Sequence, residues 1–108
     1  MLKVAMVTHT SSRIPRAARQ IGENLTTWRK LQDLTAAQVA DRAGVSRTTL
    51  SKLEHGESGV SPGVVLEVLR ALGQLDAVDK ATDPYESDLG RVRASQELPQ
   101  RVRRRGAG

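Results

Sequence analysis

The stretch TAAQVADRAGVSRTTLSKLEHG, residues 35–56, decides how this chain folds. It holds two short segments with apolar residues at helical spacing, separated by Gly44, Val45 and Ser46. Ala40 is small where two helices must cross closely, and Gly44 allows the left-handed backbone angle of a tight turn. The apolar residues expected on the inner face are Val39, Val45, Leu50 and Leu53. This spacing is typical of a helix-turn-helix.

Helix starts and helix ends follow one pattern along the middle of the chain. Thr35 with Gln38 three residues later predicts a capping box. Ser46 and Ser61 predict two further N-caps, the second followed by a proline in the first helical turn. A glycine follows each of three apolar segments, at Gly44, Gly56 and Gly73, where a left-handed residue commonly ends a helix.

A longer helix is predicted before this stretch, over residues 15–31. Its apolar residues recur at spacings of four and three, and they are Ile14, Ala18, Ile21, Leu25 and Trp28. Gly22 is a weak helix former within it. We expect Trp28 to belong to the core and not to a stacking surface for nucleotide bases.

The fold predicted from these segments is all-α. Leu75 and Val78 indicate a short fifth helix, which gives a five-helix bundle over residues 14–80. Residues 1–13 are expected to form a disordered arm, and residues 81–108 a flexible basic tail. Within the tail, residues 88–99 are open to two interpretations, a short helix or a segment that binds a partner.

Composition limits the possible functions. Seventeen Lys and Arg against twelve Asp and Glu give a net charge of +5, which suits a nucleic-acid partner but is also common in other soluble domains. The chain has no cysteine, which excludes a disulfide, a cysteine nucleophile and a thiolate zinc site. No apolar run approaches a membrane span. Trp28 and Tyr85 are the only aromatic residues, too few for an aromatic platform that binds single strands.

The motif in residues 35–56 resembles the Cro/cI/XRE family of helix-turn-helix regulators, and the resemblance extends over about residues 21–78. It implies a lambda-repressor-like domain whose second motif helix enters the major groove of double-stranded DNA. Residues 47–55 would form that helix. The alternative is a helical hairpin that serves only for packing or for binding a protein.

The resemblance also implies which side chains would read DNA. Arg47 would pair with guanine O6 and N7, and Thr48 would contact a thymine methyl group or a phosphate. Lys52, one turn later, would reach a base or a phosphate. Ser46 and Ser51 are secondary candidates, and the alternative role of Ser46 is that of a helix cap alone.

The resemblance also implies an ion pair between two positions, and a third position departs from the family. Family members often pair an arginine of the first helix with a glutamate near the end of the reading helix, and Arg29 and Glu54 stand there. We therefore expect a partly buried ion pair. The family usually has Gln directly after the first cap, where it holds a phosphate, whereas this chain has Ala36. That contact would be lost or would move to Gln38.

A looser resemblance concerns GVSPGVVLEVLRALGQLDAV, residues 59–78, and the tail, residues 83–105. Both are similar to antitoxins of the HipB type, which accompany HipA-type kinase toxins. This resemblance implies a dimer that represses its own operon and holds a HipA-like kinase inactive.

The function expected from the sequence is sequence-specific repression by a homodimer on palindromic half-sites, in the cytoplasm at the nucleoid, without a cofactor or metal. The basic residues 101–105 would add phosphate contacts or serve solubility. The alternative function is a protein-interaction module that neutralises a toxin. An enzyme is the weakest hypothesis, because the only histidines are His9 and His55 and neither has a partner set for catalysis.

Overall fold

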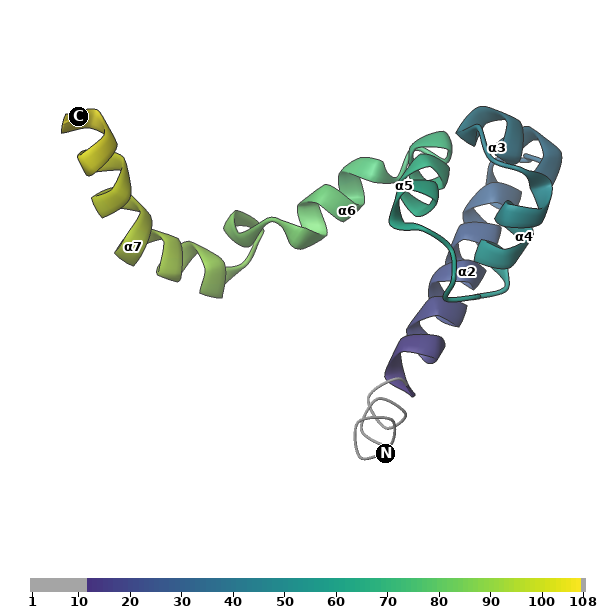
Figure 1. Ribbon diagram of the computed structural model, residues 1–108, viewed down its shortest axis with the longest axis horizontal. Coiled ribbons are helices and arrows are strands. Elements are labelled where there is room, and N and C mark those ends of the chain that lie inside the picture. Colours follow the sequence, from purple (N-terminus) through teal and green to yellow (C-terminus); the bar gives the residue numbers. More distant parts are fainter. Residues whose placement is uncertain (1–11, 108) are drawn as a thin grey trace. The chain divides into compact units, whose positions relative to one another are not determined.

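The computed structural model describes residues 12–107 and is entirely helical over that range (Figure 1). It has six α-helices and one short 3-10 helix, with no strand among these residues, which confirms the all-α fold. The described chain forms two compact units that divide between Leu75 and Asp76. The predicted arm, residues 1–13, lies outside the described residues except for its last two, and helix α2 already begins at Arg13.

The first unit contains the four helices that carry the motif. They are α2 (Arg13–Leu31), α3 (Ala36–Ala43), α4 (Arg47–Glu54) and α5 (Pro62–Ala71). Helix α3 packs against α4 and α5, and α4 also packs against α2 (Figure 1). The buried core consists of Leu25, Val39, Ala40, Ala43, Leu50, Leu53, Val68 and Leu72. All four apolar residues predicted for the inner face of the motif are in this core or packed against it.

The predicted helix starts are confirmed by their hydrogen bonds. Thr35 Oγ1 accepts from Gln38 N at 3.1 Å, and Gln38 Oε1 accepts from Thr35 N at 2.8 Å, so the capping box is complete. Ser46 Oγ accepts from the amide three residues later at 3.0 Å, and Ser61 Oγ does the same at 3.3 Å. These caps satisfy amide groups that have no partner within the helix.

The predicted helix ends are confirmed as well. Gly44, Gly56 and Gly73 have φ angles of +69°, +76° and +75°, a backbone region that disfavours other residues. The turn between α3 and α4 is therefore fixed in a geometry that only glycine adopts without strain.

The apolar face of α2 is less buried than its pattern predicts. Trp28 is 40% exposed, so the prediction that it belongs to the core is wrong. The side of α2 that faces α4 carries Gly22, Leu25 and Arg29. Trp28 directly precedes Arg29, and successive residues of an α-helix are rotated by about 100° around its axis. Trp28 therefore lies at the flank of the contact. Ile14 and Ile21 are also exposed, at 58% and 47%.

Gly22 is the point of closest approach between α2 and α4. A Cβ atom there would lie 2.5 Å from the carbonyl oxygen of Glu54 and 2.6 Å from that of Leu53. Both distances are too short for a carbon atom beside backbone. The weak helix former in the middle of α2 is thus explained by the packing of α4 against it.

The second unit contains α6 (Leu75–Thr82), the 3-10 helix η1 (Pro84–Glu86) and α7 (Asp88–Ala107). Helix α6 is the predicted fifth helix, although all but its first residue belong to this unit and not to the first. The flexibility of the tail, residues 81–108, stays a prediction. Residues 88–99 are helical, which is one of the two interpretations left open for them, because α7 extends from Asp88 to Ala107. Its start is capped by Ser87 Oγ, which accepts from Gly90 N at 3.0 Å, and Asp88 is favourable in the first turn. Six of the twenty residues of α7 are arginines, which favour a helix as well as a solvated coil.

We expect Gly22→Ala to lower the free energy of unfolding by about 2 kcal/mol or more, because the new methyl group overlaps backbone that cannot move without displacing α4. Gly63→Ala in α5 is the matched control, since a Cβ there meets nothing within 4 Å. Denaturant unfolding of the full chain followed by circular dichroism measures both. Equal stability of the two variants would contradict the close packing of α2 on α4.

Candidate DNA-binding surface

Helix α4 presents a concave, polar surface to solvent. A notch of about 610 Å³ lies between the start of α3 and one side of α4. It is lined by Ala36 of α3, by Glu57 in the loop after α4, and by five residues of α4, which are Arg47, Thr48, Ser51, Lys52 and Glu54. Four of the six side chains predicted to contact DNA are thereby brought together along one side of a short helix. We call this surface the reading face.

The other two predicted DNA contacts are engaged at helix starts. Ser46 Oγ accepts from Thr49 N and donates to Thr49 Oγ1 at 2.8 Å, so its hydroxyl is used in both directions. Gln38 Oε1 is used by the capping box and the side chain does not line the notch. For both residues the geometry favours the capping role. The phosphate contact that the family's usual Gln would make at position 36 therefore finds no support at Gln38 in this geometry.

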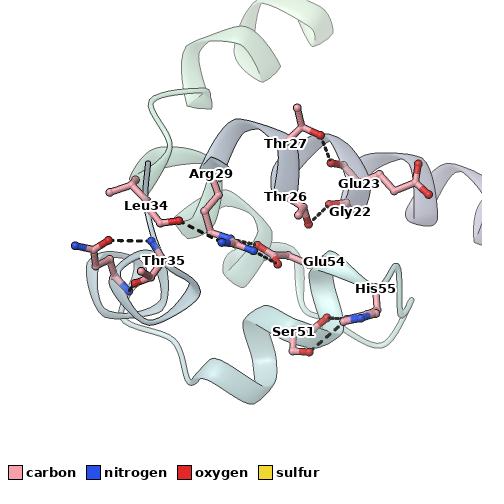
Figure 2. Close-up of polar contacts among 11 residues, drawn as sticks. Gly22, Glu23, Thr26, Thr27, Arg29, Leu34, Thr35, Ser51, Glu54 and His55 are labelled. Atoms are coloured by element: carbon pink, nitrogen blue, oxygen red, sulfur yellow. Dashed lines mark hydrogen bonds and ion pairs between the residues drawn. The ribbon is translucent and has the colours of Figure 1, made fainter. Parts of the chain in front are cut away.

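The pairing of Arg29 with Glu54 is confirmed, and Figure 2 shows the two side chains facing each other. Arg29 Nε lies 2.8 Å from Glu54 Oε2, and Nη2 lies 3.1 Å from Oε1, a two-pronged contact. Nη1 also donates to the Leu34 carbonyl oxygen at 3.2 Å. The two side chains are only 14% and 11% exposed. One guanidinium therefore joins α2, the end of α4 and the chain that enters α3.

This arrangement keeps the charges of the pair in place. The hydrogen bonds that Arg29 donates to the Glu54 carboxylate raise the pKa of Arg29 above its ordinary value, although partial burial acts in the opposite direction. Arg29 therefore stays charged at neutral pH. Glu54 lines the notch, but its carboxylate is occupied by Arg29, which limits its repulsion of a phosphate.

Lys52 and Arg47 give the reading face its positive charge. Neither forms an ion pair within residues 12–97, so both remain available to an anionic ligand.

Glu57 lies in the same notch and was not singled out from the sequence. A carboxylate there can accept a hydrogen bond from cytosine N4 and disfavours a phosphate at the same place. Its position directly after Gly56 is the signal that places it beside the end of α4.

His55 is held on α4 by contacts of its ring nitrogen Nδ1 with Ser51. Its Nδ1 lies 2.7 Å from the Ser51 carbonyl oxygen and 3.3 Å from Ser51 Oγ (Figure 2). Because a carbonyl oxygen only accepts, Nδ1 donates to it. Among residues 12–107, no group of three or more acidic or histidine side chains is placed to hold a metal ion. No helix in the same range is long and apolar enough to cross a bilayer.

Comparison with known proteins agrees with this geometry. The model of the helix-turn-helix domain matches residues 20–81, more than half of the chain. The chain belongs to the helix-turn-helix domain family. The match includes the whole of α3, the glycine turn and α4, and it extends through most of α6.

Three curated relatives are similar to the chain, two of them named as HTH-type regulators and one as an antitoxin. The HTH-type transcriptional regulator RghRB of Bacillus subtilis (strain 168) is 28% identical over 87 residues, which cover 81% of this chain and 57% of that protein. Antitoxin PezA of Streptococcus pneumoniae serotype 4 is 42% identical over 70 residues, covering 61% and 44%. The HTH-type transcriptional repressor RghR of Bacillus subtilis is 32% identical over 78 residues, covering 61% and 58%. The chain thus spans about half the length of these relatives, and no solved structure matches it.

We expect Glu54→Gln to lower the free energy of unfolding by about 3 kcal/mol, because it leaves the largely buried Arg29 guanidinium without its counter-charge. Glu67→Gln is the control, since Glu67 pairs with Arg70 on the surface, where both side chains are 51% exposed and the pair contributes less than about 1 kcal/mol. Urea unfolding of both variants at neutral pH measures the difference. A loss at Glu54 no larger than at Glu67 would show that the central pair does not brace the fold.

Proposed function

We propose that this protein is a sequence-specific, double-stranded DNA-binding transcriptional repressor of the Cro/cI/XRE type. The observation that carries the proposal is the reading face, which gathers Arg47, Thr48, Ser51 and Lys52 on one exposed side of α4. Membership of the helix-turn-helix domain family supports it, and so do the names of the two relatives from Bacillus subtilis.

The dimensions of α4 suit the major groove. An α-helix with its side chains is about 10–12 Å across, and the groove is about 12 Å wide. Arg47, at the first position of α4, would form a bidentate pair with guanine, and Thr48 would contact a thymine methyl group or a phosphate. Lys52 and Ser51 would contact a base or the backbone one turn later. The positive end of the helix dipole adds to the attraction for a phosphate.

Two copies would act together. One helix of this length contacts few base pairs, so we propose a homodimer that reads palindromic half-sites about one helical turn, ~34 Å, apart. The DNA would be the promoter of its own operon, and the site of action the nucleoid in the cytoplasm. The protein would need no cofactor, and its regulation would be by binding alone.

A second proposed role is that of an antitoxin. The similarity to antitoxin PezA favours it, because 42% identity over 70 residues is the highest of the three relatives described above. The partner that the sequence suggests is a HipA-like kinase. The two roles are compatible, since the reading face belongs to the first unit, whereas the second unit, from Asp76 onward, offers a separate surface.

We expect Arg47→Ala to abolish the preference for promoter DNA, so that the ratio of its affinities for the promoter and for a scrambled duplex falls by about tenfold or more. Salt-sensitive background binding should remain. The bidentate contact carries the base discrimination, whereas the remaining cations carry the attraction to phosphate. Fluorescence anisotropy with the duplex upstream of the gene, at two salt concentrations, measures both quantities.

Arg70→Ala is the matched control for this experiment. It removes the same charge from α5, outside the reading face, and should leave the preference unchanged. Loss of preference in both variants, or in neither, would contradict the assignment of Arg47 as a base-reading residue. Equal binding of both duplexes by the wild type would contradict the repressor function itself.

Truncation after Lys80 tests the second role. We expect the shortened chain to retain promoter preference through the reading face and to lose the ability to bind and inhibit a toxin encoded next to its gene. Pull-down and a toxin activity assay beside the DNA-binding assay measure the two functions separately. Retained toxin binding by the truncated chain would place the partner surface in the first unit.

A further inference from the structure

Glu57 places an uncommitted negative charge in the notch of the reading face. The other carboxylate there, Glu54, is held by two hydrogen bonds from Arg29. The carboxylate of Glu57, by contrast, has neither an ion pair nor a hydrogen bond within residues 12–97, and the residue is exposed. It shares the notch with Arg47 and Lys52, so a free anion lies within a surface that is otherwise suited to a polyanion.

The backbone determines where Glu57 lies. Gly56 N donates to the Leu53 carbonyl oxygen at 3.0 Å, and Glu57 N donates to the Lys52 carbonyl oxygen at 2.9 Å. These two bonds fold the chain back beside the last turn of α4. Gly56 also lies directly against the backbone of α2, where a Cβ atom would come within 2.6 Å of Arg19 Cα. Glu57 is therefore attached to a fixed end of α4 and not to a free loop.

The charged end of Glu57 favours the notch over a second hollow that the residue borders. That hollow, of about 210 Å³, has a largely apolar lining that includes Ile14, Leu53 and Val65. Ionised oxygens lose hydration against apolar side chains, whereas in the notch they remain in water near two cations. The carboxylate thus belongs to the surface that would face DNA.

Duplex DNA offers few hydrogen-bond partners to a carboxylate. At neutral pH this group accepts hydrogen bonds and donates none. Phosphate oxygens, guanine O6 and N7, and thymine O4 are acceptors as well, so each is unfavourable opposite Glu57. The donors in the major groove are the amino groups of cytosine and adenine. Adenine N6 lies beside the acceptor N7 of its own base, whereas cytosine has no acceptor on its own edge, so cytosine is the better partner.

We propose that Glu57 is a specificity-determining residue of the reading face, which accepts a hydrogen bond from the N4 amino group of a cytosine in each half-site. The inference rests on the proposed function and deepens it, because it assigns a base to a residue outside the reading helix. It also names what is rejected, since a guanine or a thymine at that position leaves the carboxylate without a donor.

Selection from a pool of randomised duplexes by the full-length wild type and by two variants tests the proposal. Glutamine pairs with adenine N6 and N7, so we expect Glu57→Gln to replace an enriched cytosine by adenine at one position of the half-site. Glu57→Ala should reduce the enrichment of that cytosine by about tenfold or more, while the guanine assigned to Arg47 stays enriched.

Glu67→Gln is the matched control, because it makes the same chemical change on α5, outside the notch, and should leave every position unchanged. Circular dichroism verifies that each variant is folded.

The amino group itself is tested by fluorescence anisotropy with the selected duplex. In a second duplex that cytosine is replaced by 2-pyrimidinone, which is cytosine without its amino group. We expect wild type to bind the second duplex about tenfold more weakly and Glu57→Ala to bind both alike.

Two results would overturn the proposal alone. One is an unchanged selected sequence with Glu57→Gln at higher affinity for every duplex, since Glu57 would then act on phosphates only. The other is equal weakening of wild type and Glu57→Ala by removal of the amino group. In both cases an enriched guanine that depends on Arg47 leaves the repressor function intact. A wild type that enriches no sequence rejects the repressor function and the proposal together.

Discussion

The first unit depends on the ion pair between Arg29 and Glu54. The pair joins the first helix of the motif domain to the last residue of the reading helix, and a third hydrogen bond reaches the Leu34 carbonyl oxygen before α3. Largely removed from water, it has a strong preference for one geometry, because any displacement leaves a charge without its partner. On the same side of α2, the backbone of α4 lies directly against Gly22, so the two helices cannot approach each other more closely. Together they fix how α4 is presented.

The reading face follows from these constraints. Side chains that discriminate base edges must be held in register by a rigid support, and α4 is fixed at its start by the Ser46 cap and at its end by Glu54. The buried residues Leu50 and Leu53 hold its inner side to the core. The polar residues on the opposite side are thereby exposed together, and the positive charges of Arg47 and Lys52 have no ion-pair partner among the residues that the structure describes.

Local signals were sufficient to predict the helices, their caps and the left-handed glycines from the sequence. The capping residues act over three positions, so their hydrogen bonds are encoded in neighbouring residues. The pairing of Arg29 with Glu54, 25 residues apart, could be predicted only through the resemblance to a family. The exposure of Trp28 could not be predicted, because periodicity shows which side of a helix is apolar but not how much of it another helix covers. Neither could the extent of α7, whose charged composition suits a solvated coil as well as a helix.

The central claim is that α4 reads a DNA sequence as one of a pair. Selection of bound molecules from a pool of randomised duplexes by the full-length protein, followed by sequencing, tests it most directly. The account predicts an inverted repeat with half-sites about one helical turn apart and a guanine in each half-site that loses its enrichment with Arg47→Ala. A pool that shows no enriched sequence would contradict the claim, as would the same motif selected by the wild type and the variant.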